Sequence, residues 1–197
     1  MKQHLNRIWR SAATVSLIAM LAGCGINTIP TEQEQAKAAW SEVQNQYQRR
    51  ADLIPNLVNT VKGYAQQEQK VLTEVTQARA KATSVQINAN DLTDPEALRR
   101  FQDAQAQLSG ALGRLLAVSE NYPDLKSNQN FLALQSQLEG TENRIAVARR
   151  DYIMAVQVYN TEVETFPGRF WASFYSAKPM ATFTTSEENQ RAPSVQF

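Results

Sequence analysis

Four charged residues occur at helical positions where apolar residues are expected, and these four are the best candidates for chemistry. They are Arg50, Glu68, Glu142 and Arg149. Glu142 and Arg149 are seven residues apart, so on a helix they lie two turns apart on one face. Carboxylates in such a cluster could perform acid–base catalysis or bind a metal ion. We favour the alternative, a mutually neutralising polar layer that fixes the helix register, because buried charges persist only when they are paired.

Other groups that commonly build catalytic sites are scarce in this chain. The single histidine is His4 and the single cysteine is Cys24, so no disulfide can form within one chain. The sequence has no glycine-rich phosphate-binding loop. Its formal net charge of +1 gives no electrostatic reason to expect nucleic acid. We therefore predict no enzyme activity, no catalytic residue, no metal, no cofactor and no small-molecule substrate.

The first residues resemble an export signal. Lys2, Arg7 and Arg10 make a basic start, and residues 11–22 form an apolar run. This run is shorter than the about 20 residues that a membrane-spanning helix needs. It has the length of the apolar region of a signal peptide.

The motif Leu21-Ala22-Gly23-Cys24 directly after this run resembles the lipobox of bacterial lipoproteins. The resemblance implies cleavage between Gly23 and Cys24 and acylation of the Cys24 thiol, with palmitate as a typical chain. Two or three acyl chains would hold the protein on a membrane. Gly25 and Ile26 follow, where an Asp would imply retention in the inner membrane. We expect an outer-membrane anchor that faces the periplasm if the cell is Gram-negative; the alternative is a plain signal peptide or N-terminal anchor in which Cys24 is incidental.

The remaining chain divides into three parts. After a signal peptide of residues 1–23, residues 24–32 are expected to form a short tether. Residues 33–178 should form a helical bundle, and residues 179–197 a mostly irregular tail. Phe183, Val195 and Phe197 could pin that tail against a helix.

Residues 40–82 have the longest apolar stripe of the chain, so we predict one long first helix. Pro55 interrupts it and should kink the helix without ending it. The stripe recurs every seven residues, at Trp40, Tyr47, Ile54, Val61, Val75 and Ala82, with Glu68 as the polar exception.

Two further long helices are expected, at residues 95–120 and from residue 127 or 128 to residue 166. The first has apolar residues at intervals of seven, and the second has the most regular heptad of the chain: Phe131, Leu138, Ile145, Tyr152, Tyr159 and Phe166. Short connections favour antiparallel neighbours. The predicted fold is all-α: an elongated antiparallel up-and-down bundle of three long helices, the first kinked, plus a short C-terminal helical element, similar to a four-helix bundle and with coiled-coil-like heptads.

The part of the first helix before Pro55 lacks a partner in this arrangement, because the second helix is too short to reach it. Its apolar residues Trp40, Val43 and Tyr47 nevertheless continue the stripe, and such stripes usually indicate a contact. We favour an arm that bends back onto the bundle. The alternative is an interaction surface for an envelope protein, a second copy of the chain or a membrane partner.

Aromatic residues gather near the C-terminus at Phe170, Trp171, Phe174 and Tyr175, between Arg169 and Lys178. Aromatic rings with basic flanks are typical of a lipid interface. We favour the alternative, in which these rings plug the open end of the bundle.

Residues 36–197 resemble the LemA family, through motifs in the same order as in that family. The motifs are Arg49-Arg50-Ala51-Asp52-Leu53-Ile54-Pro55-Asn56-Leu57-Val58, Ser119-Glu120-Asn121-Tyr122-Pro123-Asp124-Leu125-Lys126, Leu138-Glu139-Gly140-Thr141-Glu142-Asn143-Arg144-Ile145, Ala148-Arg149-Arg150-Asp151-Tyr152, Tyr159-Asn160-Thr161 and Phe166-Pro167. The sequence departs from the family at Ile153, where Asn is usual, and at Arg169-Phe170-Trp171, where Asn-Leu-Ile is usual.

The resemblance implies an extracytoplasmic helical bundle that is attached to a membrane by its N-terminus and has no established catalytic activity. Its magnetosome branch implies a part in membrane remodelling. The expected function is that of a membrane-anchored scaffold or adaptor in the bacterial envelope, attached through lipidated Cys24 and acting with a protein partner or as a homo-oligomer. The alternative is an accessory subunit of a membrane-bound peptidase or hydrolase, or, less favoured, a hydrolase itself.

Overall fold

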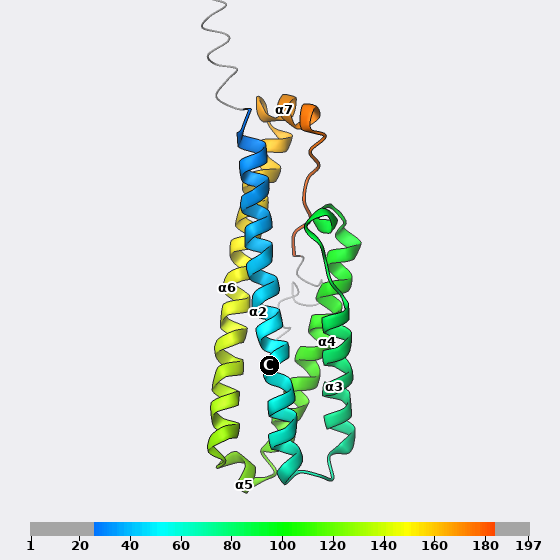
Figure 1. Cartoon of the computed structure of the whole chain (residues 1–197), viewed down its shortest axis with the longest axis vertical. Coiled ribbons are helices and arrows are strands. Elements are labelled where there is room, and N and C mark those ends of the chain that lie inside the picture. Colours follow the sequence, from blue (N-terminus) through cyan, green and yellow to red (C-terminus); the bar gives the residue numbers. More distant parts are fainter. Residues whose placement is uncertain (1–25, 184–197) are drawn as a thin grey trace, which may run out of the picture.

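The computed structural model describes residues 26–183, apart from the side chain of Asn90, and this part of the chain is mostly helical. In chain order the elements are α2 (Thr28–Tyr64), α3 (Gln69–Ser84), the 3-10 helix η1 (Ala89–Thr93), α4 (Pro95–Ser119), α5 (Pro123–Lys126), α6 (Gln129–Glu164) and α7 (Gly168–Tyr175). They form an elongated helical bundle (Figure 1), which confirms the predicted all-α fold. The predicted signal peptide and lipidation site lie outside the described residues.

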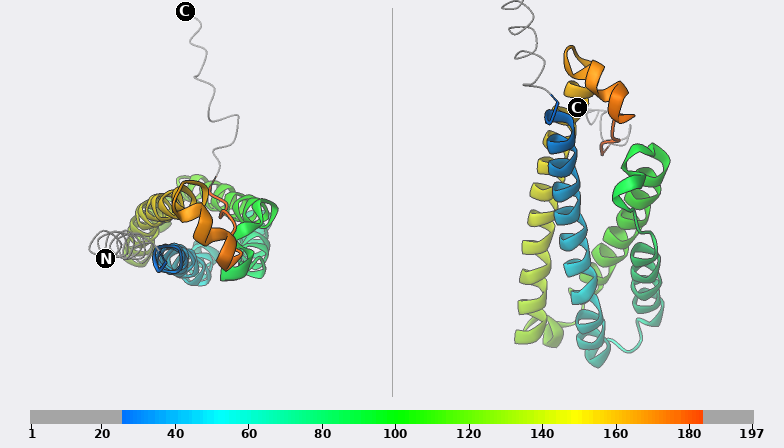
Figure 2. Two further views of the ribbon diagram at one scale, coloured as in Figure 1. Left: turned by 90° about the horizontal axis from the view of Figure 1, so that it is seen from above. Right: turned by 45° about the horizontal axis from the view of Figure 1, so that its top comes forward.

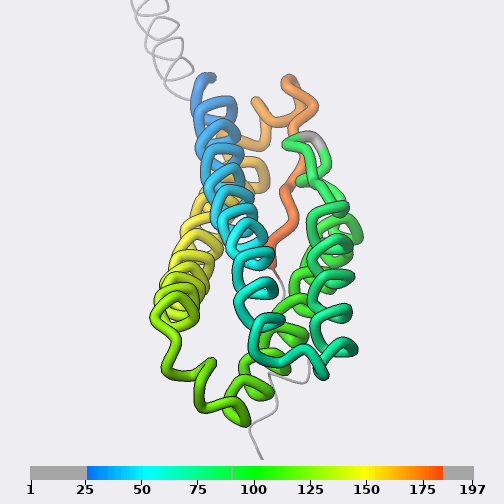
Figure 3. The backbone as a smooth tube through the Cα atoms, turned by 60° about the horizontal axis from the view of Figure 1, so that its bottom comes forward, coloured from blue at the N-terminus to red at the C-terminus, as the bar shows by residue number. Residues whose placement is uncertain are grey.

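Two long helices of nearly equal length form the main axis of the bundle. The helices α2, with 37 residues, and α6, with 36, lie side by side and run in opposite directions (Figures 1 and 3). The shorter helices α3 and α4 form a second antiparallel pair, and α3 also packs on α2. The long helices therefore alternate in direction, as an up-and-down bundle requires.

The long first helix predicted over residues 40–82 is wrong in one respect, because it is two helices. It continues through Pro55, as expected, but α2 ends at Tyr64 and α3 begins at Gln69. Glu68, the polar exception in the apolar stripe, lies at the start of α3. The reversal at residues 65–68 lets Leu72 and Val75 pack back against the end of α2. The second half of the stripe is thereby buried in a helical hairpin.

The start of α2 also differs from the expected tether. The helix begins at Thr28, so residues 28–32 are helical and Ile29 is buried. Pro30 falls in the first turn, where a missing backbone N–H is tolerated. The part of α2 before Pro55 does not bend back onto the bundle, because α6 runs beside it.

Helix α6 ends earlier than its heptad pattern predicts. The helix ends at Glu164, and Phe166 is 89% exposed instead of buried. The chain then turns closely against α6: a Cβ at position 168 would collide with the backbone oxygen of Glu162. Only glycine fits so close to the backbone of α6, and α7 begins at this residue, Gly168.

Two apolar clusters fill the bundle. The upper core, nearer α7, contains Trp40, Tyr47, Phe101, Ile145, Tyr152, Phe183 and other residues. The lower core, nearer α5, contains Ile54, Val61, Val75, Leu108, Leu115, Leu138 and other residues. Along α2 the boundary between them falls at Arg50, along α4 at Gln105 and along α6 at Glu142.

Candidate functional site

A buried guanidinium group marks the boundary between the two cores. Arg50 is 1% exposed. Its Nη1 donates hydrogen bonds to Glu142 Oε1 and to Ser109 Oγ, both at 2.9 Å. Its Nη2 donates to Gln105 Oε1 at 2.6 Å. We call these four residues the polar layer.

The polar layer joins all four long helices. Arg50 comes from α2, Gln105 and Ser109 from α4, and Glu142 from α6. The Gln105 amide also donates to the Ala82 carbonyl of α3 at 3.2 Å. Since a shift of any one helix would leave a buried donor or acceptor without its partner, the layer fixes the relative register of the helices.

Of the four charged residues predicted to form this layer, the structure pairs two and places a third, Arg149, close to them beside Tyr47. Arg50 and Glu142 pair, whereas Glu68 accepts a hydrogen bond from the Tyr122 hydroxyl at 3.0 Å, at the opposite end of α4 from the upper core. This hydrogen bond raises the pKa of the Tyr122 hydroxyl. Arg149 instead lies over the Phe183 ring, with its guanidinium carbon 4.4 Å from the ring centre. The predicted four-residue layer is therefore wrong for Glu68, whereas Arg149 lies at the edge of the layer and outside its hydrogen-bonded residues.

Sequence reasoning missed Gln105 and Ser109. A signal for Gln105 was present, because it interrupts the apolar series Leu98, Phe101, Leu108 and Leu112 on the buried face of α4. A glutamine inside such a series indicates a buried polar partner. Ser109 has no comparable signal, since it lies at the edge of that face.

The geometry of the polar layer favours a structural role over a chemical one. The Arg50 guanidinium is held by three side chains, and the Glu142 side chain is 44% exposed. Within residues 26–183, no group of three or more His, Cys, Asp and Glu residues is placed to hold a metal ion. Tyr47 packs under Arg50, with 4.9 Å from the guanidinium carbon to the ring centre. Burial raises the pKa of the Tyr47 hydroxyl, although the nearby Arg149 and Arg50 oppose this.

The predicted interaction surface on the first helix is wrong, because all three of its residues are inside the upper core. Trp40 is 1% exposed, Val43 is fully buried and Tyr47 is 8% exposed. The Trp40 ring contacts Phe101 and Tyr152, with ring centres 5.4 and 5.2 Å apart. Because α6 is as long as α2, these residues find their partners within the chain.

A non-helical segment, residues 177–183, completes the upper core, and we call it the C-terminal strap (orange-red in Figure 3). Side chains of α6 hold its backbone. The Asn160 amide donates to the Met180 carbonyl and accepts from the Met180 N–H, both at 2.8 Å. The Tyr152 hydroxyl donates to the Ala181 carbonyl at 2.8 Å, and the Tyr159 hydroxyl to the Lys178 carbonyl at 3.1 Å. Phe183 is buried, as predicted, whereas Val195 and Phe197 lie outside the described residues.

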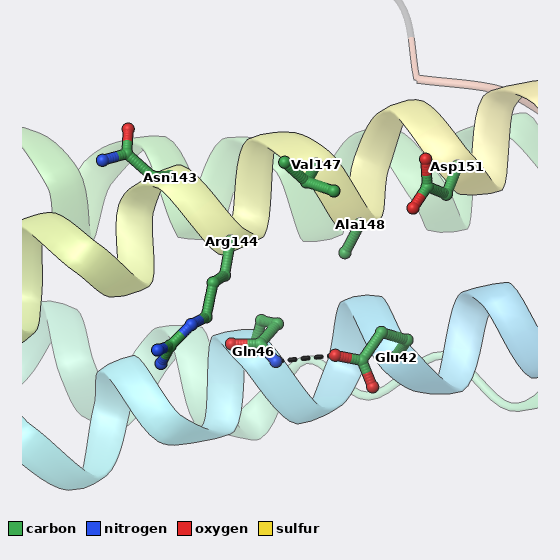
Figure 4. A pocket seen from close by; sticks show the side chains of 7 residues that line it. All are labelled: Glu42, Gln46, Asn143, Arg144, Val147, Ala148 and Asp151. Atoms are coloured by element: carbon green, nitrogen blue, oxygen red, sulfur yellow. Dashed lines mark hydrogen bonds between the residues drawn. The ribbon is translucent and has the colours of Figure 1, made fainter.

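An open groove of about 470 Å³ runs along the seam between α2 and α6 on the outside of the bundle. Figure 4 shows its lining residues: Glu42, Gln46, Asn143, Arg144, Val147, Ala148 and Asp151. The Gln46 amide donates to Glu42 Oε1 at 2.6 Å. The groove is lined by short apolar side chains and by charged side chains of both signs. The charged groups do not point toward one common binding position.

The aromatic residues of α7 do not plug the bundle as a group. Trp171 is half-buried and packs against the upper core. Phe170 and Phe174, one helical turn apart, are 67% and 73% exposed. Tyr175 is 40% exposed. The favoured packing interpretation is therefore right for Trp171 and wrong for the two phenylalanines and Tyr175.

Comparison with known proteins identifies the family. A sequence model of the LemA family matches residues 39–197, which is most of the chain. The chain belongs to the LemA family. The family match includes the polar layer, the lower core, the strap and the upper core except Ile29 and Ala36.

Curated relatives of this LemA-family chain are distant in sequence. Protein LemA of Metamycoplasma hominis is 26% identical over 161 residues, which cover 82% of this chain and 69% of that protein. Magnetosome protein MamQ 2 of Paramagnetospirillum magneticum is 27% identical over 178 residues, and the match covers 81% of this chain and 65% of that protein. Magnetosome protein MamQ of Magnetospirillum gryphiswaldense is 25% identical, with coverage of 80% and 64%. The chain thus spans about two thirds of the length of these relatives.

None of the helices in residues 26–183 combines the length and the apolarity that crossing a bilayer requires.

Proposed function

We propose that this LemA-family protein is a lipid-anchored extracytoplasmic scaffold or adaptor that acts through protein or membrane contacts in the bacterial envelope. The observation that carries this proposal is the way in which the buried polar groups are used. The Arg50 guanidinium and the Tyr152, Tyr159 and Asn160 side chains bond to other parts of the same chain. These buried polar groups therefore stabilise the fold, and we expect the contacts that carry function to lie on the outer surface.

Support for membrane attachment comes from the sequence before the bundle. The apolar residues 11–22 and the motif that ends at Cys24 are features of a lipoprotein signal. The relatives named magnetosome proteins agree with a function at a membrane, since a magnetosome is a membrane-bounded body. We extend this to an outer-membrane anchor facing the periplasm in a Gram-negative cell.

The test of the anchor is the intact mass of the full chain produced in a bacterium with the lipoprotein pathway. The expected product begins at an acylated Cys24 and partitions into the detergent phase. The control is Cys24→Ser, which keeps the size of the side chain and removes the thiol, and which should remain unprocessed and unacylated. A wild-type chain that retains residues 1–23, or that carries no lipid at Cys24, would overturn the lipoprotein proposal.

The test of the scaffold is crosslinking mass spectrometry on native membranes. We expect crosslinks from surface lysines of the bundle to another envelope protein or to a second copy. Crosslinks only within one chain would contradict a scaffold that works through protein contacts. Glu142→Gln separates this proposal from a carboxylate enzyme. A folded variant should support the cell envelope as the wild type does, whereas a folded variant that fails to do so would favour the enzyme.

A further inference from the structure

The exposed aromatic face of α7 lies at the end of the bundle where α2 begins. Phe170 and Phe174 lie one turn apart on α7, Phe166 lies in the turn just before that helix, and each is at least two-thirds exposed, at 67%, 73% and 89%. Figure 2 shows α7 as a cap over the same end at which the described chain enters α2. The sequence that precedes this point includes the apolar residues 11–22 and Cys24.

The orientation of α7 is fixed by the bundle below it. Gly168 and Ala172 are buried on its inner face, and Trp171 packs against the upper core. After α7 the chain turns at Ser176, which has a left-handed backbone with φ of 52°, and enters the strap. Phe170 and Phe174 therefore point away from the bundle because the opposite face of α7 is already used.

We infer that the exposed face of α7 that carries Phe170 and Phe174, together with Phe166 in the turn before it, docks into the surface of the lipid bilayer. The inference rests on the proposed membrane anchor and adds a second contact to it. An anchor at Cys24 holds the start of α2 close to the bilayer, and α7 lies at that same end. The effective concentration of lipid at this face is therefore high, and even a weak apolar contact is populated. Aromatic rings with basic neighbours, here Arg169 and Lys178, suit the boundary between headgroups and acyl chains.

A lipid surface fits this face better than a second protein chain does. Three phenylalanine rings of roughly 200 Å² each fall below the roughly 800 Å² that each partner buries in a standard protein interface. A small apolar tip is sufficient, however, as the second of two membrane signals. Other exposed apolar residues on α6, such as Val147 and the neighbours Met154 and Val158, are each only about half exposed, which is ordinary for a protein surface.

The charge at this end predicts how the docking depends on lipid composition. Arg169 and Lys178 are exposed beside α7, and the acidic residue Glu164 is exposed at the end of α6. With charges of both signs near the aromatic face, apolar insertion rather than attraction to anionic lipid should dominate. Docking should therefore occur on phosphatidylcholine vesicles and should change little when phosphatidylglycerol is added.

The experiment uses the full chain, purified from membranes and reconstituted into phosphatidylcholine vesicles. A spin label is attached at Ser173→Cys, an exposed position of α7 between the two phenylalanines. The matched control label is at Asn130→Cys, an exposed position at the opposite end of the bundle. Collision rates are measured with oxygen, which concentrates in lipid, and with a water-soluble nickel complex. The chain without an introduced cysteine serves as the blank, since an acylated Cys24 takes no label.

We expect vesicles to carry the protein on flotation. The label at position 173 should collide severalfold more with oxygen than with the nickel complex, and the label at position 130 should show the reverse preference. The double substitution Phe170→Ser and Phe174→Ser should move the label at position 173 to the behaviour of position 130. The control Val147→Ser and Val158→Ser, which removes exposed apolar side chains elsewhere, should change neither label.

Each other outcome overturns a stated part of the inference. Protein that floats while the label at position 173 stays in water refutes the docking and leaves the anchor intact. Protein that does not float refutes the anchor and the docking together. Dipolar broadening between labels at position 173, with shielding from both reagents, would show that a second copy covers α7 instead of lipid. A double serine variant that keeps its lipid contact would refute the part assigned to the two phenylalanines.

Discussion

Below Arg50 the core of the bundle is closed almost entirely by helical residues, whereas above it residues 85–93 and the strap, which lie outside the long helices, complete the core. The lower core takes its large residues mainly from α2, α3, α4 and α6. The upper core adds Ile87 and Leu92 from residues 85–93, and Met180 and Phe183 from the strap. The upper ends of α2 and α6 extend beyond the shorter pair α3 and α4, so other parts of the chain must cover them.

The two regions also differ in how their parts are held. In the lower core, apolar burial between helices is sufficient. In the upper core, the covering segments need further hydrogen bonds for their backbone, since they have few helical bonds of their own outside the short 3-10 helix η1. The Trp40 indole donates to the Ile87 carbonyl at 3.2 Å, and the Ala181 N–H donates to the Leu92 carbonyl at 2.7 Å. Loss of one side chain in the upper core should therefore release a whole segment.

The largest expected effect comes from Trp40→Ala. Removal of this buried ring should lower the free energy of unfolding by about 3–5 kcal/mol, through lost burial and the cavity left behind. Hydrogen exchange should also accelerate in residues 85–93 and in the strap, because both contact Trp40. The control in the lower core is Leu115→Ala, which should cost about 2–5 kcal/mol without selective release of those segments. A stable Trp40→Ala protein with an unchanged strap would contradict this packing of the upper core.

The next largest effect tests the boundary between the cores. Arg50→Met leaves the acceptors of Gln105 and Glu142 without their donor, but the partly exposed Glu142 can bind water instead. We expect a loss of about 2–3 kcal/mol in urea unfolding, toward the lower end of the range for a broken buried ion pair. The control is Arg114→Met, which removes a more exposed arginine from its pair with Glu74. It should change stability by less than about 1 kcal/mol. Equal effects of the two substitutions would show that the polar layer has no special role.

A smaller effect is expected from Asn160→Asp in the upper core. The carboxylate can still accept from the Met180 N–H, but it can no longer donate to the Met180 carbonyl and would face that oxygen. The expected cost is about 1–2 kcal/mol, together with faster hydrogen exchange in the strap. The control is Asn143→Asp on the exposed surface of α6, which should leave the strap unchanged. Strap exchange that is as slow in Asn160→Asp as in the wild type would show that the amide is not needed to hold it.

The same contrast explains how much of the fold the sequence could predict. Heptad residues such as Ile54, Leu108 and Leu138 all lie in the lower core, because helix periodicity alone determines which face is buried. The reversal after Tyr64 was missed, since an apolar stripe continues in phase across it. The Glu68 position was the one local sign of a break.

The upper core and the candidate site were harder to predict because their contacts join residues far apart in the chain. Arg50 and Glu142 could be assigned to a buried layer from their heptad positions, and they do pair. No periodicity indicates that Asn160 binds the Met180 backbone, or that Trp40 binds the Ile87 carbonyl. Whether α7 turns its rings inward or outward depends on the close turn at Gly168, which is a property of the folded chain.

The smallest expected effect concerns alkaline pH and again singles out the upper core. Burial raises the pKa of the Tyr152 hydroxyl above its ordinary value of 10.0, so the folded protein retains this proton when the unfolded chain loses it. The stabilisation is complete below pH 10 and falls as pH rises above it, by at most about 1.4 kcal/mol per pH unit for this group. Tyr152→Phe should cost about 1 kcal/mol at neutral pH through the lost bond to Ala181. The free energy of unfolding of this variant, measured in urea, should then decline less than that of the wild type between about pH 8 and about pH 11. Tyr175→Phe, at a partly exposed ring on α7, is the control for the loss of one tyrosine and should decline like the wild type. An equally steep decline in Tyr152→Phe would assign the alkaline sensitivity to groups other than Tyr152, such as Tyr47 and Tyr159, whose hydroxyl pKa burial also raises.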